Sequence, residues 1–208
     1  MRQPNRRIAV AVLGAVALCA GSALAAPPLP PTPVSDDMSL GDPKAKVKLV
    51  EYASLSCSHC ATFNNEVFPA FKKKYIDTGK VHYTLREILT PPAQVAAAGY
   101  LTARCAGKDK YFTVVDAVFR GHDEMVNTGD ARAVLVAAAK AGGLSEAQFE
   151  ACLSDTAALD ALNARVSRNA KQGEIAGTPT FVFNGVKVKE GEMTADELDA
   201  AVAAASKR

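Results

Sequence analysis

The chain has 208 residues, 49% of them apolar and 22% charged, which is enough for one well-packed core with room for an inserted subdomain. Its 24 basic and 22 acidic residues give a formal net charge of +2. A charge so close to balance argues against nucleic acid or an anionic membrane surface as a partner.

Residues 1–25 have the order of a secretory signal peptide. Three arginines precede an apolar run over residues 8–20, and the small residues of a cleavage site follow at 23–25. The run is too short to span a bilayer comfortably, and the bulky Leu18 before Cys19 disfavours a lipidation signal. We therefore expect cleavage after residue 25 and export of the remaining chain to an oxidising compartment.

The next segment predicts a leader, a strand, a helix and a second strand. Prolines concentrated early in residues 26–46 favour an extended leader. Residues 47–54 and 80–89 mix β-branched and aromatic side chains without a helical period, which predicts two strands. Residues 59–79 between them predict a helix that Pro69 kinks or breaks. The apolar face of this helix consists of Phe63, Val67, Phe71 and Tyr75.

The second half of the chain predicts a run of helices followed by a hairpin and a last helix. Residues 91–173 are rich in alanine and predict four or five helices. Two strands are then expected to turn at Asn184-Gly185. Thr194, with Glu197 three positions on, predicts a capping box that opens the C-terminal helix.

This order of elements is that of an α/β thioredoxin fold with an inserted all-helical subdomain. Residues 47–90 are expected to form the first part of the thioredoxin-like domain and residues 174–208 the second part. Residues 91–173 are expected to form the helical insertion between them.

The stretch "SLSCSHCATF" places Cys57 and Cys60 three positions apart around His59. A structural zinc site needs four ligands, and no second ligand pair is visible because Cys105 and Cys152 are 47 positions apart. The spacing therefore indicates redox chemistry rather than metal binding, and no cofactor is expected.

The position of the pair between a strand and a helix predicts the role of each cysteine. Unpaired N–H groups at a helix N-terminus stabilise an anion, so Cys57 is the expected nucleophilic thiolate and Cys60 its resolving partner. The His59 ring either favours the Cys57 thiolate or is a solvated side chain on an exposed turn. The first alternative favours an oxidant.

Three further residues have a functional and a structural interpretation. Glu51, in the apolar strand before the pair, either points inward as a proton relay to Cys60 or points outward to solvent. Pro179, before the strand "TFVF", either follows a cis bond that exposes the Thr178 backbone to a substrate strand, or is an ordinary trans proline.

The motifs "VEYASLSCSHCATF" and "GTPTFVFNG", with the helical stretch between them, resemble the DsbA-type thiol:disulfide oxidoreductases of the bacterial periplasm. The resemblance covers nearly all of the chain after residue 25. It implies a Cys57 nucleophile stabilised by His59, a cis Pro179 beside the disulfide and an acidic relay at Glu51. Ser58 departs from the proline of the best-known members, and Thr178 occupies a position that varies between oxidases and isomerases, so the resemblance leaves the redox poise open.

Cys105 and Cys152 both fall inside the predicted insertion, and in an oxidising compartment we expect them to form a structural disulfide. The alternative is two free buried thiols. Closing a loop of this length stabilises a fold by at most about 4 kcal/mol in the chain-entropy model.

The leading hypothesis is a monomeric periplasmic dithiol oxidase that gives its disulfide to reduced exported polypeptides. By resemblance, a quinone-linked membrane protein reoxidises it. One alternative is a disulfide isomerase or reductase. Another is a protein that binds without turnover, either a thiol chaperone or a copper-binding protein, although the scarcity of Met and His near the cysteines argues against copper.

Overall fold

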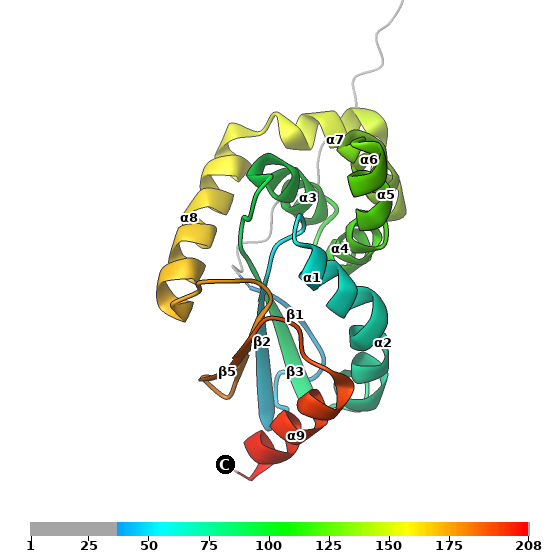
Figure 1. The fold of residues 1–208 in the computed structure, drawn as a ribbon. Coiled ribbons are helices and arrows are strands. Elements are labelled where there is room, and N and C mark those ends of the chain that lie inside the picture. The colour runs from blue at the N-terminus through cyan, green and yellow to red at the C-terminus, as the bar shows by residue number, and fades with distance from the viewer. Residues whose placement is uncertain (1–36, 208) are drawn as a thin grey trace, which may run out of the picture.

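The structure is a computed structural model that describes residues 37–207. The predicted signal peptide and the proline-rich part of the predicted leader lie outside the described residues. Five strands form one sheet in the order β1-β3-β2-β4-β5 (Figure 1). β2 and β3 are parallel, and the other neighbouring strands are antiparallel. The strands are β1 Met38–Leu40, β2 Val47–Ala53, β3 Val81–Glu87, β4 Thr180–Phe183 and β5 Val186–Glu190.

The strand β1 corrects the prediction that residues 26–46 are a leader throughout. Met38 pairs with Leu85 and Leu40 with Tyr83, so β1 forms one edge of the sheet. Met38 is buried in the core. A strand of three residues is too short to show an alternating pattern, and for that reason its position could not be predicted.

The helix after the cysteine pair is irregular on both sides of Pro69. The α-helical segments α1 (Ser58–Thr62) and α2 (Phe68–Phe71) alternate with π-helical segments at Phe63–Val67 and Lys72–Ile76. Proline has no N–H to continue the ladder, and the wider π turn before Pro69 accommodates this gap. The predicted apolar face packs on the sheet, with Phe63 and Phe71 buried and Val67 and Tyr75 partly buried against the core.

Six helices form the insertion, so the prediction of four or five was wrong. Gly121 is the single residue between α4 and α5, and such a short break does not interrupt a helical pattern in the sequence. In Figure 1, α3 to α7 lie beyond the end of the sheet where α1 begins, and α8 runs back along the sheet toward β4. The helices are α3 Ala93–Cys105, α4 Tyr111–Arg120, α5 His122–Thr128, α6 Ala131–Ala141, α7 Glu146–Leu153 and α8 Thr156–Gly173.

A buried polar cluster attaches the insertion to the sheet. Glu87, at the end of β3, accepts hydrogen bonds from Nε of Arg104 at 2.5 Å and from Nε of Arg165 at 2.9 Å. The Tyr111 hydroxyl donates to the same carboxylate at 3.1 Å, and the Asn169 amide donates to the Glu87 carbonyl. These contacts join β3 to three helices of the insertion. They therefore fix the position of the insertion relative to the end of β2, where the cysteine pair lies.

The chain after the insertion has the predicted local structure. Asn184 and Gly185 both have positive φ, as a two-residue hairpin turn requires. Thr194 and Glu197 form the capping box at the start of α9 (Ala195–Ser206). Among the described residues no helix is both long and apolar enough to cross a bilayer.

Candidate active site

The cysteine pair lies at the point where β2 gives way to the first helix. Cys57 is the N-cap residue of α1, and its N–H donates to the Ser54 carbonyl at 3.1 Å. Cys57 is partly exposed, whereas Cys60, one turn further, is fully buried. Both thiols are free in this structure. Only the first sulfur is therefore placed to meet a large substrate.

Hydrogen bonds at the Cys57 sulfur lower its pKa from 9.0 to about 5. The largest contribution is the hydrogen bond with the Cys60 thiol, and smaller ones come from Thr178 and from the backbone N–H groups of Cys60 and His59. Partial burial acts in the opposite direction. Cys57 is consequently a thiolate at neutral pH.

The second thiol has the opposite character. Burial raises the pKa of Cys60 well above its usual value, and the nearby Cys57 and Glu51 raise it further. Cys60 therefore keeps its proton and donates a hydrogen bond toward Cys57. The pair combines an attacking thiolate with a protonated partner, which is the arrangement that thiol–disulfide exchange uses.

Thr178 and Pro179 lie on the other side of the Cys57 sulfur. The peptide bond between them is cis, and the Cys57 thiol lies 3.3 Å from the Thr178 carbonyl oxygen. Gly191 donates its N–H to the Pro179 carbonyl at 2.7 Å. The fold thus brings together two segments that are 121 positions apart in the sequence.

The His59 ring is placed differently from the expectation that it acts on the Cys57 sulfur. Its Nδ1 lies 2.5 Å from a carboxylate oxygen of Glu192, and both side chains are largely exposed. This contact raises the His59 pKa. Toward Cys57, His59 contributes its backbone N–H, together with a weak attraction between the imidazolium and the thiolate.

Glu51 points inward, beneath the pair. Its side chain is buried and accepts a hydrogen bond from the Tyr83 hydroxyl at 2.7 Å. Burial raises its pKa from 4.5 to about 7, although the Tyr83 hydrogen bond partly opposes the rise. The group is therefore able to take or release a proton near neutral pH.

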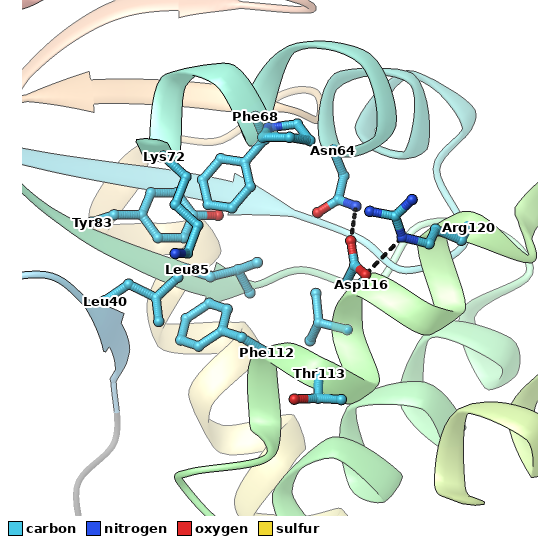
Figure 2. Close-up of a pocket in the computed structure, with 12 residues that line it drawn as sticks. Leu40, Asn64, Phe68, Lys72, Tyr83, Leu85, Phe112, Thr113, Asp116 and Arg120 are labelled. Carbon is cyan, nitrogen blue, oxygen red and sulfur yellow. Dashed lines mark hydrogen bonds and ion pairs between the residues drawn. The ribbon is translucent and has the colours of Figure 1, made fainter. Parts of the chain in front are cut away.

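Tyr83 separates this carboxyl group from an apolar cavity of ≈ 380 Å³ between α2, β3 and α4. Figure 2 shows the Tyr83 ring on the cavity wall with Phe68 and Phe112. Neither cysteine of the pair lines this cavity. Phe68 and Phe112 pack against the Tyr83 ring, and the burial of Glu51 behind it is the cause of the raised pKa.

We expect Glu51→Gln to stabilise the reduced protein at pH 8 and to leave its stability at pH 4 unchanged. The raised pKa means that the folded state disfavours the ionised carboxyl group, so this group's contribution to stability is present below pH 4.5 and is lost as the pH rises to about 7. The loss amounts to roughly 3 kcal/mol. The glutamine side chain cannot ionise and still accepts the Tyr83 hydrogen bond. Urea unfolding at the two pH values measures the difference.

The exposed Glu66 supplies the control for this experiment. Glu66→Gln removes the same charge from the surface and is expected to change the free energy of unfolding by less than about 0.5 kcal/mol at either pH. An equal effect of Glu51→Gln at pH 4 and pH 8 would contradict the buried ionisation.

Cys105 and Cys152 lie away from this site, where α3 meets α7. The structure joins them by an S–S bond of 2.03 Å. Among residues 37–207, no three His, Cys, Asp or Glu side chains group as metal ligands would. Two residues of the site, Tyr83 and Glu192, were not expected from the sequence. Tyr83 lies in a predicted strand, whereas Glu192 contacts a residue 133 positions away and belongs to no motif.

Comparison with known proteins agrees with this geometry. A family model described as thioredoxin matches residues 34–204. A Rickettsia typhi protein named as a putative protein-disulfide oxidoreductase is 34% identical over 156 residues, covering 74% of this chain and 57% of its own length. A Rickettsia conorii protein of the same description is 34% identical over 168 residues, covering 80% of this chain and 59% of its own length. The chain thus spans about three-fifths of the length of these relatives.

Solved structures extend the comparison to the whole fold. Wolbachia pipientis alpha-DsbA1 aligns with a TM-score of 0.74 at 29% identity, covering 84% of this chain and 93% of the other. BdbD from Bacillus subtilis aligns with a TM-score of 0.66 at 21% identity, covering 83% of this chain and 94% of the other. At this identity the likeness supports the fold alone. The predicted thioredoxin fold with a helical insertion is confirmed. The chain belongs to the thioredoxin family, and within it to the DsbA-type proteins.

Proposed function

We propose that this protein is a thiol:disulfide oxidoreductase that donates a Cys57–Cys60 disulfide to reduced exported polypeptides in the periplasm. The observation that carries the proposal is the contrast between the two thiols. Cys57 is accessible and has a pKa of about 5, whereas Cys60 is buried and has a raised pKa. Interactions that stabilise the Cys57 thiolate stabilise the reduced pair, so they make the disulfide a stronger oxidant.

The reaction transfers two electrons from the substrate to the pair. A substrate thiolate attacks the Cys57 sulfur, the bond to Cys60 breaks, and Cys60 leaves as a thiolate that takes up a proton. Glu51, with a pKa of about 7, is the proposed donor of that proton. A second substrate thiolate then attacks the substrate sulfur of the mixed disulfide, and Cys57 leaves as the stabilised thiolate.

Thr178 and Pro179 are proposed to bind the substrate backbone. The Thr178 carbonyl contacts the Cys57 sulfur, and Pro179 follows it directly before β4. An extended peptide aligned with this segment would present its cysteine to Cys57. By analogy with DsbA-type proteins, we propose a quinone-linked membrane protein as the partner that reoxidises the pair.

A disulfide isomerase or reductase is the second candidate. The observation that favours it is the contact between His59 and Glu192, because a ring held by a carboxylate supports the Cys57 thiolate less than a free imidazolium would. The oxidase and the reductase make opposite demands on the redox potential, whereas an isomerase is recognised by its ability to rearrange the disulfides of a scrambled substrate.

We expect equilibration of the purified protein with glutathione to give a reduction potential well above the −270 mV typical of thioredoxin, roughly in the range from −180 to −120 mV. The same preparation, once oxidised, should convert an equimolar reduced dithiol peptide to its disulfide. A potential near that of thioredoxin together with a near-neutral Cys57 pKa would reject the oxidase and support the reductase.

A further inference from the structure

The contact between His59 and Glu192 joins two segments on either side of the reactive sulfur. His59 is the second residue of α1, and Glu192 lies in the loop between β5 and α9. The ring nitrogen and the carboxylate oxygen are 2.5 Å apart, with 69% and 41% of the two side chains exposed. Among the described residues, Glu192 is the hydrogen-bonding partner that the structure gives to the His59 ring.

Glu192 is held in position by its neighbours in the chain. Gly191, which has a φ of +94°, donates its N–H to the Pro179 carbonyl beside Cys57. On the other side, Met193 is buried in the core and Thr194 caps α9. An exposed glutamate is usually free to sample many positions, but here the backbone on both sides is fixed. The carboxylate is therefore presented to the active site by the fold.

Titratable groups from several elements lie around the Cys57 thiolate. From β2 the facing group is Glu51, and from α1 it is Cys60 together with His59. The loop after β5 supplies the carboxylate that pairs with His59. From α5, the buried His122 ring lies 3.4 Å from the carbonyl of Ser56, the residue before Cys57. Whatever fixes the position of the His59 ring therefore controls an exposed positive side chain that interacts with the Cys57 thiolate.

We propose that Glu192 is a positioning residue that restrains the His59 imidazolium away from the Cys57 thiolate and thereby limits the oxidising strength of the pair. The role of this restraint in an oxidase rests on the proposed function. The effect of Glu192 on the Cys57 thiolate rests only on the geometry of the three side chains. Without Glu192 the ring is free to turn toward the thiolate, and the weak attraction between the imidazolium and the thiolate becomes stronger than in the native protein.

The size of the effect on the Cys57 pKa depends on pH in a way that identifies its cause. An unrestrained histidine has a pKa near 6.5, so below about pH 6 the ring is charged with or without Glu192. In this range Cys57 also titrates, and removing Glu192 lowers the Cys57 pKa. At pH 8 a ring without Glu192 is mostly neutral, so the gain disappears.

The test compares Glu192→Gln with the native protein at pH 5.5 in low salt. The absorbance of the thiolate as a function of pH should show a Cys57 pKa about half a unit lower. The equilibrium with glutathione should shift about threefold toward the reduced pair, which corresponds to about 15 mV. Both effects should shrink in about 0.5 M salt. Glu190→Gln is the matched control, since Glu190 is an exposed glutamate of β5 that pairs with Lys187.

A double-mutant cycle with His59→Asn decides whether Glu192 acts through the ring. In the His59→Asn background, Glu192→Gln should shift the Cys57 pKa by less than about 0.2 units, because no ring remains to be released. An equal shift in both backgrounds, or no shift in either, would overturn the inference. These equilibrium measurements need no substrate, so they are independent of the proposed function. If the protein does not oxidise dithiols but Glu192→Gln still shifts the Cys57 pKa only when His59 is present, the proposed function is rejected and this inference stands.

Discussion

Replacing Cys57 by serine will reduce the oxidation of a dithiol substrate to the rate seen without protein. Replacing Cys60 by serine will instead arrest the protein as a mixed disulfide. In the first variant no accessible sulfur of the pair remains, because Cys60 is fully buried and its pKa is raised. In the second, Cys57 still exchanges with an oxidised substrate, but the protein has lost the resolving thiol that would displace the substrate from Cys57. Mass spectrometry after acid quenching detects the trapped adduct, and substrate oxidation followed over time measures the loss.

The pH dependence of alkylation provides the second readout of this prediction. The pKa of Cys57 is depressed from 9.0 to about 5, so its stabilising effect on the reduced protein is complete above pH 9 and is lost as the pH falls through 5. Cys57 should react with iodoacetamide with a half-maximal rate near pH 5 in native protein, and Cys60 should not react. Equal labelling of both cysteines, or a half-point near the ordinary thiol value of about 8.5, would contradict the assigned roles.

The elements whose signals are local could be predicted from the sequence. The strand before the pair, the turn at Asn184-Gly185 and the capping box of Thr194 each depend on residues within a few positions of one another, and each lies where it was expected. The Cys57 position at a helix N-terminus follows from the same kind of signal. Chemistry set by adjacent residues was therefore readable without a structure.

Features that depend on distant contacts were not readable. Glu51 had an inward and an outward interpretation because a single strand does not reveal which of its faces is covered. Tyr83 decides the matter, since its hydroxyl meets the Glu51 carboxylate only when β3 pairs with β2 in the observed register. Glu192 had no motif at all. It reaches His59 because β5 ends beside the Pro179 segment, which is a property of the sheet and not of the local sequence.

Glu87→Gln is expected to lower the free energy of unfolding by about 3–5 kcal/mol, because it removes the negative charge that two buried guanidinium groups share. Arg104 and Arg165 are each at most 7% exposed, and both direct Nε at the Glu87 carboxylate. The substituted glutamine keeps the shape of the side chain and one acceptor but cannot compensate two cations. Chemical denaturation of the reduced protein at pH 7 measures the loss.

The chain also contains an exposed group of ion pairs that serves as a control. It shows how much of the loss in unfolding free energy is due to burial of the charges and not to the charges themselves. Arg132 bridges Glu146 and Glu150 with all three side chains about half exposed, and Glu146→Gln there should cost less than about 1 kcal/mol because water solvates the freed cation.

The Cys57 pKa should be the same in both variants, since Glu87 acts on the attachment of the insertion and not on the sulfur. If the two substitutions cost the same, the attachment of the insertion to the sheet would depend on apolar packing and not on the Glu87 charge. A large loss for Glu87→Gln alone would identify that charge as the main contact holding α3 and α8 on β3, and so holding the insertion at the edge of the active site.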